Sequence, residues 1–357
     1  MLLSTKLSMK VTPLNNLKSN PLYDSLVRAE EKAKESIPAG YAEIRLSTEG
    51  KLFAPEVFHV RDFKTEELLE ISLISTEDLP KVLLKILKNM IYEKDVDPAK
   101  FHISEVEETL VHIYMTFFSP TMDNVIFPVE DDDLEYLKSN NTPESYESLL
   151  EDLRSKRWVP QTSFNIQNDV DTYDIPEKFK PYITIKNNKT GFEAVFRYLC
   201  YSDQLIINDF LDDYFAEQDT KFEKVKTAGI DILSREDRKE YEDYTRKRLM
   251  YFTLALNYCS VVSLEGQDLS ELSLAEKFQI CNENPQLNSS VITILNEKQS
   301  KQRFGIKPEV RMKNPITGEI CLRRFPFRVS SILQACILYR PAWSDDGAVD
   351  SSEYIVE

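Results

Sequence analysis

Residues 182–198 read YITIKNNKTGFEAVFRY, and this stretch predicts two β-strands joined by a tight turn. Its apolar residues alternate with polar ones on both sides of Asn187–Gly191, as expected for strands that bury one face. Asparagine and glycine are favoured in such turns because they tolerate the backbone angles that reverse the chain. The stretch therefore predicts an antiparallel hairpin.

Two other parts of the chain have a similar organisation. Residues 313–318, KNPITG, match residues 186–191, KNNKTG, at four positions, and an arginine follows six residues after each glycine, at Arg197 and Arg324. A looser copy surrounds Gly50. Each predicted hairpin is followed by an apolar run that could begin a helix. The three units are either copies of one duplicated building block or independent turns that use the same residues for local steric reasons.

Between and after the hairpins the apolar period changes to three or four residues, which predicts helices. Thr65 is a candidate N-cap, Thr142 precedes a proline at the first helical position, and Ser104 with Glu107 fits a capping box. Helices are expected to begin after Pro21, at Thr65, at Ser104 and at Thr142. Further helices are expected to cover residues 77–92, 202–215, 234–258, 270–280 and 289–297. The predicted fold class is α+β, mostly helical, with small antiparallel β-hairpins.

A loop-rich connection with three prolines predicts a division into two or more domains. The expected organisation is an N-terminal arm (1–20), an α+β domain with one hairpin (21–157), the Pro-rich connection (158–181), a second α+β domain with two hairpins (182–343) and an acidic tail (344–357).

Composition excludes several classes of function. The 357-residue chain has a formal net charge of −16, which argues against direct, sequence-independent nucleic-acid binding. Only eight residues are glycine, and no phosphate-binding glycine motif is present, which argues against a nucleotide-binding fold. No apolar stretch reaches the length of a membrane-spanning helix, so no membrane contact is expected. Five cysteines without a CxxC pair indicate free thiols in a reducing compartment.

Acidic residues are the strongest candidates for chemistry. Glu130–Asp133 would suit a divalent cation, or the start of a helix, where negative charge is favourable; the second is preferred because no spaced ligands follow. Asp169, Asp171 and Asp174 lack the glycine and glutamate of a calcium-binding loop. The three histidines show no metal-ligand spacing. We therefore predict no catalytic residue, no cofactor and no metal ligand, and we expect that the chain is not an enzyme.

Arginines lie among aromatic residues near the end of the chain, a composition typical of protein interfaces. Core burial of the two phenylalanines is the alternative. The predicted partner-contact residues are Arg323, Arg324, Phe325, Phe327 and Trp343.

The order of several short motifs resembles a known family. Residues 60–68, VRDFKTEEL, end the first strand pair and precede a helix, and residues 102–107, HISEVE, begin another. FGI at 304–306 is followed by KNPITGE at 313–319 and FPF at 325–327. These features are similar to the baseplate hub and tail-assembly proteins of contractile-tailed bacteriophages, over about residues 40–120 and 300–330. The resemblance implies a structural or assembly role, contacts with other tail components and no catalytic residues.

The expected function is thus that of a non-enzymatic structural component of a phage tail baseplate. It would act through protein–protein contacts, possess other tail or baseplate proteins as partners, and occur in several copies per assembly. It would be found in the virion, and in the host cytoplasm during assembly. Two alternatives stay open: a cellular adaptor or binding module, and a metal-dependent enzyme with a carboxylate site.

Overall fold

The computed structural model describes residues 37–75, 78–229, 233–287, 289–325 and 327–338. By its internal contacts the chain divides into residues 1–41 and 42–357, and the description below concerns the second part together with the start of its first strand. The helix predicted after Pro21, the N-terminal arm and the acidic tail lie outside the described residues. Among the described residues, no helix is both long and apolar enough to cross a membrane.

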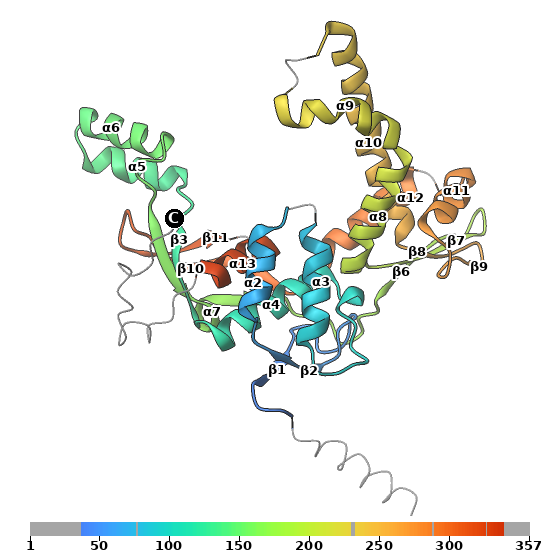
Figure 1. Ribbon diagram of the computed structural model, residues 1–357, viewed down its shortest axis with the longest axis horizontal. Coiled ribbons are helices and arrows are strands. Elements are labelled where there is room, and N and C mark those ends of the chain that lie inside the picture. Colours follow the sequence, from blue (N-terminus) through green and yellow to red (C-terminus); the bar gives the residue numbers. More distant parts are fainter. Residues whose placement is uncertain (1–36, 76–77, 230–232, 288, 326, 339–357) are drawn as a thin grey trace, which may run out of the picture. The chain divides into compact units, whose positions relative to one another are not determined.

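The described residues form twelve α-helices and small antiparallel sheets of two to four strands, which confirms the α+β class. Figure 1 labels these elements. In chain order they are β1 (Tyr41–Arg45), β2 (Val57–Arg61), α2 (Thr65–Leu73), α3 (Leu79–Met90), the 3₁₀ helix η2 (Pro98–Lys100), α4 (Ile103–Phe117), β3 (Thr121–Ile126), α5 (Asp131–Asn140), α6 (Pro143–Arg154), β4 (Gln161–Asn165), α7 (Ile166–Asp169), β5 (Val170–Thr172), β6 (Tyr182–Asn187), β7 (Phe192–Arg197), α8 (Tyr201–Tyr214), α9 (Ala216–Ala228), α10 (Arg235–Cys259), β8 (Val261–Leu264), β9 (Gln267–Asp268), α11 (Leu274–Glu283), α12 (Ser289–Lys301), β10 (Ile306–Lys313), β11 (Ile320–Arg324) and α13 (Val329–Leu338).

All three predicted hairpins are confirmed, as the pairs β1–β2, β6–β7 and β10–β11. Their turn glycines, Gly50, Gly191 and Gly318, have φ angles of 70°, 76° and 80°. Glycine adopts this left-handed conformation at no steric cost, whereas residues with a side chain adopt it less readily, so glycine is favoured at each of these turn positions. The sequence pattern did not predict β8 and β9, which extend the second hairpin to a four-stranded sheet in the order β6-β7-β8-β9.

The expected helices within the described residues are present, but two of their predicted N-caps are wrong. Lys64 is the N-cap of α2, and Thr65 is already helical. His102 is the N-cap of α4: its Nδ1 accepts a hydrogen bond from the Ser104 amide at 3.2 Å, and Glu105 accepts one from the His102 amide at 2.9 Å. At α2, Glu67 accepts a hydrogen bond from the Lys64 amide at 2.8 Å. Glu67 and Glu105 thus each satisfy an amide at the start of a helix that has no partner within the helix. The predicted cap at Thr142 is confirmed.

Two of the three hairpins are joined to the next helix by the same contact, which we call the strand-to-helix clamp. Arg61 at the end of β2 donates to both carboxylate oxygens of Glu67, at 2.9 and 2.6 Å. Arg197 at the end of β7 donates to Asp203 in the same bidentate manner, at 2.6 and 2.8 Å. In each case the acid stands six residues after the arginine and also caps its helix.

The third hairpin lacks this clamp. Arg324 occupies the arginine position at the end of β11, but Ser330 stands six residues later, so no carboxylate is available there. The turn sequence is therefore shared by the second and third units, whereas the clamp is shared by the first and second. A common origin of the three units stays a prediction.

The predicted connection at 158–181 is not simply a loop. It contains β4, which pairs with β3, and β5, which pairs with β10. Pro160 directly precedes β4, and Pro176 and Pro181 lie between β5 and β6, so the prolines flank the strands instead of interrupting their ladders.

The buried apolar residues form two clusters. One includes β1, β2, α3 and α4 and also takes in Val310 and Met312 of the last hairpin and Ile332 and Leu333 of α13. The other includes β6, β7, α8, α10 and α11. The predicted domain boundaries stay a prediction, but the last hairpin, which the sequence predicts to belong to the second domain, contributes its buried face to the first cluster.

Candidate functional site

The site is built on the last hairpin, whose turn is held by one asparagine. The Asn314 side-chain oxygen accepts hydrogen bonds from the amides of Ile316 and Thr317, at 2.8 and 3.2 Å. The Asn314 amide donates to the Glu319 carbonyl at 2.7 Å, and Gly318 donates to the Asn314 carbonyl at 2.8 Å. Asparagine is favoured in turns for this use of its side chain. These hydrogen bonds therefore stabilise the conformation of the turn.

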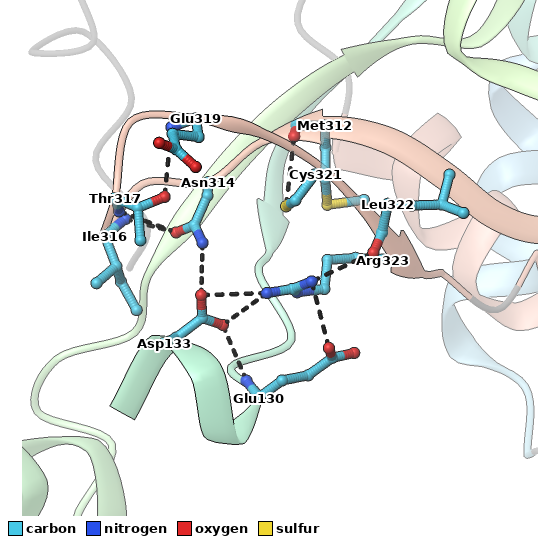
Figure 2. A network of polar contacts seen from close by, with 10 residues as sticks. All are labelled: Glu130, Asp133, Met312, Asn314, Ile316, Thr317, Glu319, Cys321, Leu322 and Arg323. Carbon is cyan, nitrogen blue, oxygen red and sulfur yellow. Dashed lines mark hydrogen bonds and ion pairs between the residues drawn. The ribbon is translucent and has the colours of Figure 1, made fainter. Parts of the chain in front are cut away.

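A buried polar network attaches this hairpin to the start of α5 (Figure 2). Asp133 accepts a hydrogen bond from the Asn314 amide group at 2.5 Å and two from Arg323, both at 3.1 Å. Arg323 also pairs with Glu130 at 3.2 Å, and its guanidinium carbon lies 5.4 Å from the centre of the Phe127 ring. The side chains of Arg323 and Asp133 are only 10% and 2% exposed. We call Asp133, Asn314 and Arg323 the hairpin anchor.

The acidic run at 130–133 thus has a structural use that the sequence did not reveal. Asp133 caps α5 by accepting the Glu130 amide at 2.9 Å while it holds the hairpin. Burial by itself would raise the pKa of Asp133, but the hydrogen bonds from Glu130, Asn314 and Arg323 outweigh it and hold the pKa below its usual range. Within the described ranges, no group of three or more histidine, cysteine, aspartate or glutamate residues is placed to hold a metal ion.

Replacing Asp133 with asparagine is expected to lower the free energy of unfolding at pH 7 by about 2 kcal/mol, because both carboxylate oxygens accept bonds and an amide group would face a donor. Since the folded state lowers the pKa of Asp133, its contribution is present above the ordinary value near 3.8 and is lost as the pH falls through the folded-state pKa. Urea unfolding at pH 7 and pH 3 should therefore show a smaller difference from the wild type at pH 3. Asp132→Asn, at an exposed neighbouring position, is the control; an unchanged difference at both pH values would contradict the assignment.

The outer face of β11 is apolar and exposed. Its residues alternate, so that Ile320 is 79% exposed, Leu322 is 57% exposed and Arg324 is exposed, whereas Cys321 and Arg323 face inward. In the register of the hairpin these three outer residues lie opposite Lys313, Arg311 and Glu309 of β10. The outer face of the hairpin therefore carries two large apolar side chains on β11, and the β10 side chains opposite this strand are two basic ones and one acidic one.

β11 is also the last strand of its sheet, whose order is β11-β10-β5. The Phe325 amide bonds to the Pro308 carbonyl, so by the alternation of an antiparallel ladder the amides and carbonyls of Ile320, Leu322 and Arg324 point away from β10. The Leu322 carbonyl accepts one bond from Arg323, at 3.3 Å. Within the described part of the chain, β11 has a neighbouring strand on one side only.

The predicted partner-contact residues have different environments. Arg324 is exposed, at the end of the outer face of β11. Arg323 belongs to the hairpin anchor. Phe327 is only 6% exposed and belongs to the first core cluster, which agrees with the alternative that this phenylalanine is buried in the core. Phe325 is half-buried, with its ring 5.3 Å from that of Phe164 and 5.0 Å from that of Phe327. Trp343 lies outside the described residues.

The sequence pattern predicted the hairpin but not the exposure of Ile320 and Leu322. In both strands apolar residues alternate with polar ones, so the pattern alone does not distinguish the buried apolar residues of β10 from the exposed ones of β11. The signal was in the turn: a Lys313–Ile320 pair next to the turn places Ile320 on the same face as Lys313, and Met312 on the other. Only one of these faces can be buried.

Comparisons with protein-family models, with curated proteins and with solved structures found no match.

Proposed function

We propose that this protein is a non-enzymatic structural or assembly component of a bacteriophage tail baseplate, and that it acts through protein–protein contacts. The observation that carries the proposal is the exposed apolar edge strand β11 on an internally anchored hairpin. The sequence motifs that resemble phage tail-assembly proteins lie directly beside this strand, at 304–306, 313–319 and 325–327.

An edge strand offers a partner unpaired amides and carbonyls, and strand addition is a common mode of protein recognition. Ile320 and Leu322 would be buried in such a contact, which favours association because apolar surface leaves water. The hairpin anchor keeps β11 in place before the partner arrives, so less conformational freedom is lost on binding. These features support a role in assembly, with other tail or baseplate proteins as partners and several copies in one assembly.

The proposal is tested by locating the protein. Mass spectrometry of purified virions and of isolated tail-assembly intermediates is expected to detect it in one or both, and cryo-electron microscopy would then place it in the tail or baseplate. Absence from virions and intermediates alike would contradict the proposal.

Changing Leu322 to aspartate is expected to reduce incorporation into tails at least about tenfold, because a charge without a partner would have to be buried in the contact. Quantitative mass spectrometry of tails from a phage that carries the variant would measure this. Leu69→Asp is the matched control, since Leu69 is 55% exposed on helix α2 and Leu322 is 57% exposed. Equal incorporation of both variants, with both folded by circular dichroism, would contradict a contact through β11.

A further inference from the structure

A cavity of about 450 Å³ lies at the Arg324 end of β11. Its walls come from segments far apart in the sequence: the start of α4, the residue after β5, the residues after β7, the end of α12 with the residues that follow it, and strands β10 and β11. Six of its residues carry the argument, namely His102, Tyr173, Tyr198, Arg303, Phe304 and Arg324.

The charge of this cavity is opposite to that of the whole chain. Arg303 and Arg324 line it, and no aspartate or glutamate does. Arg303 donates to the Tyr173 hydroxyl at 3.2 Å, and the Lys307 ammonium lies 5.9 Å from the centre of the same ring. Glu309, opposite Arg324 in the hairpin, is an acidic neighbour of this group, and its charge acts on Arg303, although among the described residues no ion pair joins it to either arginine. A basic cavity in a protein of charge −16 is suited to a carboxylate.

Aromatic rings form the other wall of the cavity. The Phe304 ring lies 5.0 Å from that of Tyr198 and 5.3 Å from that of His102, in edge-to-face contact. Burial lowers the pKa of His102 to about 4, so the imidazole is neutral at neutral pH. The positive charge at the cavity therefore comes from the arginines, whose planar guanidinium groups match a carboxylate.

The cavity and the outer face of β11 share Arg324, which gives a partner strand a defined pattern. Side chains on one face of an added strand recur every second residue, as Ile320, Leu322 and Arg324 do. Two apolar side chains would face Ile320 and Leu322, and the next side chain on that face would lie beside Arg324, which lines the cavity.

We propose, on the basis of the function proposed above, that the partner segment is an extended strand with two apolar residues at alternate positions and an aspartate or glutamate two residues beyond them. The carboxylate of that residue is bound between Arg303 and Arg324. In an antiparallel arrangement the pattern is acidic-x-apolar-x-apolar, and in a parallel one it is the reverse.

Fluorescence anisotropy with the full chain and labelled, blocked peptides tests this inference. The probes are Thr-Glu-Thr-Val-Thr-Val-Thr and its reversed sequence, each compared with the version that has glutamine for glutamate. A glutamine peptide with a free C-terminal carboxylate distinguishes a chain terminus from an acidic side chain as the source of the carboxylate. We expect a glutamate peptide to bind at least about tenfold more tightly than its glutamine version.

Variants of the protein show whether the cavity is responsible. Arg303→Ala and Arg324→Ala are each expected to remove about tenfold of the affinity for the glutamate peptide and to leave the glutamine peptide unchanged. Arg246→Ala, an exposed arginine of α10 that does not line the cavity, is the control and should bind as the wild type does. Binding of neither glutamate peptide, equal binding of the glutamate and glutamine versions, or displacement by a single-stranded oligonucleotide would overturn the inference.

The outcomes separate this inference from the proposed function. If both peptide versions bind equally and Leu322→Asp abolishes both, docking on β11 stands and the role of the cavity falls. If the glutamate peptide binds in an arginine-dependent manner but Leu322→Asp assembles normally, the carboxylate site stands and the role of β11 in assembly falls.

Discussion

Replacing Asp203 with alanine is expected to lower the free energy of unfolding by about 3 kcal/mol, because it leaves the partly buried guanidinium of Arg197 without its counterion. Asp203 is 2% exposed, and both of its oxygens accept bonds from Arg197. One of them also accepts the Cys200 amide at 2.6 Å, and the Cys259 thiol lies 3.4 Å from the other. The substitution therefore removes a helix cap together with the strand-to-helix clamp.

Urea unfolding followed by circular dichroism measures this effect. The matched control is Glu240→Gln, which removes an exposed ion pair with Lys221 and is expected to change the free energy of unfolding by less than about 0.5 kcal/mol. The double variant Arg197→Met with Asp203→Ala should recover about 1 kcal/mol relative to Asp203→Ala, since the unpaired charge is gone. A loss below about 1 kcal/mol for Asp203→Ala, or strictly additive effects in the double variant, would argue against the clamp as a source of stability.

Glu105→Gln is expected to lower the free energy of unfolding by about 3 kcal/mol, although the two side chains have nearly the same shape. Glu105 is fully buried, and its two oxygens accept bonds from the Thr48 hydroxyl and from the amides of Phe53, Ala54 and His102. Each oxygen of Glu105 accepts a bond from a backbone amide, so the NH₂ group of a glutamine would face a hydrogen-bond donor in either orientation of its side chain. Burial raises the pKa of Glu105, although these bonds act in the opposite direction.

A second buried glutamate on the same helix serves as the control. Glu108 is 2% exposed, and its oxygens accept bonds from the Ser47 amide at 2.7 Å and the Ser47 hydroxyl at 2.8 Å. Because a hydroxyl can also accept a bond, glutamine can satisfy both groups, and Glu108→Gln should lose less than about 1 kcal/mol. Thermal and urea unfolding of both variants would test the contrast. Equal losses would mean that burial, and not the set of donors around Glu105, determines the cost.

Local sequence signals were sufficient for the three hairpins and most of the helices, but not for β3, β4, β5, β8 and β9. Each hairpin turn carries a glycine that its positive φ favours, and the alternating or helical apolar periods located most strands and helices. The helix starts were less predictable. His102 caps α4 because Glu105 bonds back to its amide, and Ser104 was an equally good candidate by residue type alone.

The environment of the last hairpin could not be predicted in the same way. Arg323 and Arg324 are adjacent and chemically identical, yet one is held by Asp133, 190 residues away in the sequence, and the other is exposed. The pairing partner of Arg323 depends on how α5 lies against the hairpin, and no local pattern encodes that contact.

The amino-acid sequence alone determined the α+β class and the positions of the three hairpins, because turn residues and apolar periods act over a few neighbouring positions. Only the tertiary structure decided which face of β11 is buried, which acid pairs with Arg323 and which residues form the cavity at Arg324. The reason is physical: burial and ion pairing depend on groups that folding brings together from distant segments, so the same alternating strand can present either face to the core until its register and its neighbours are known.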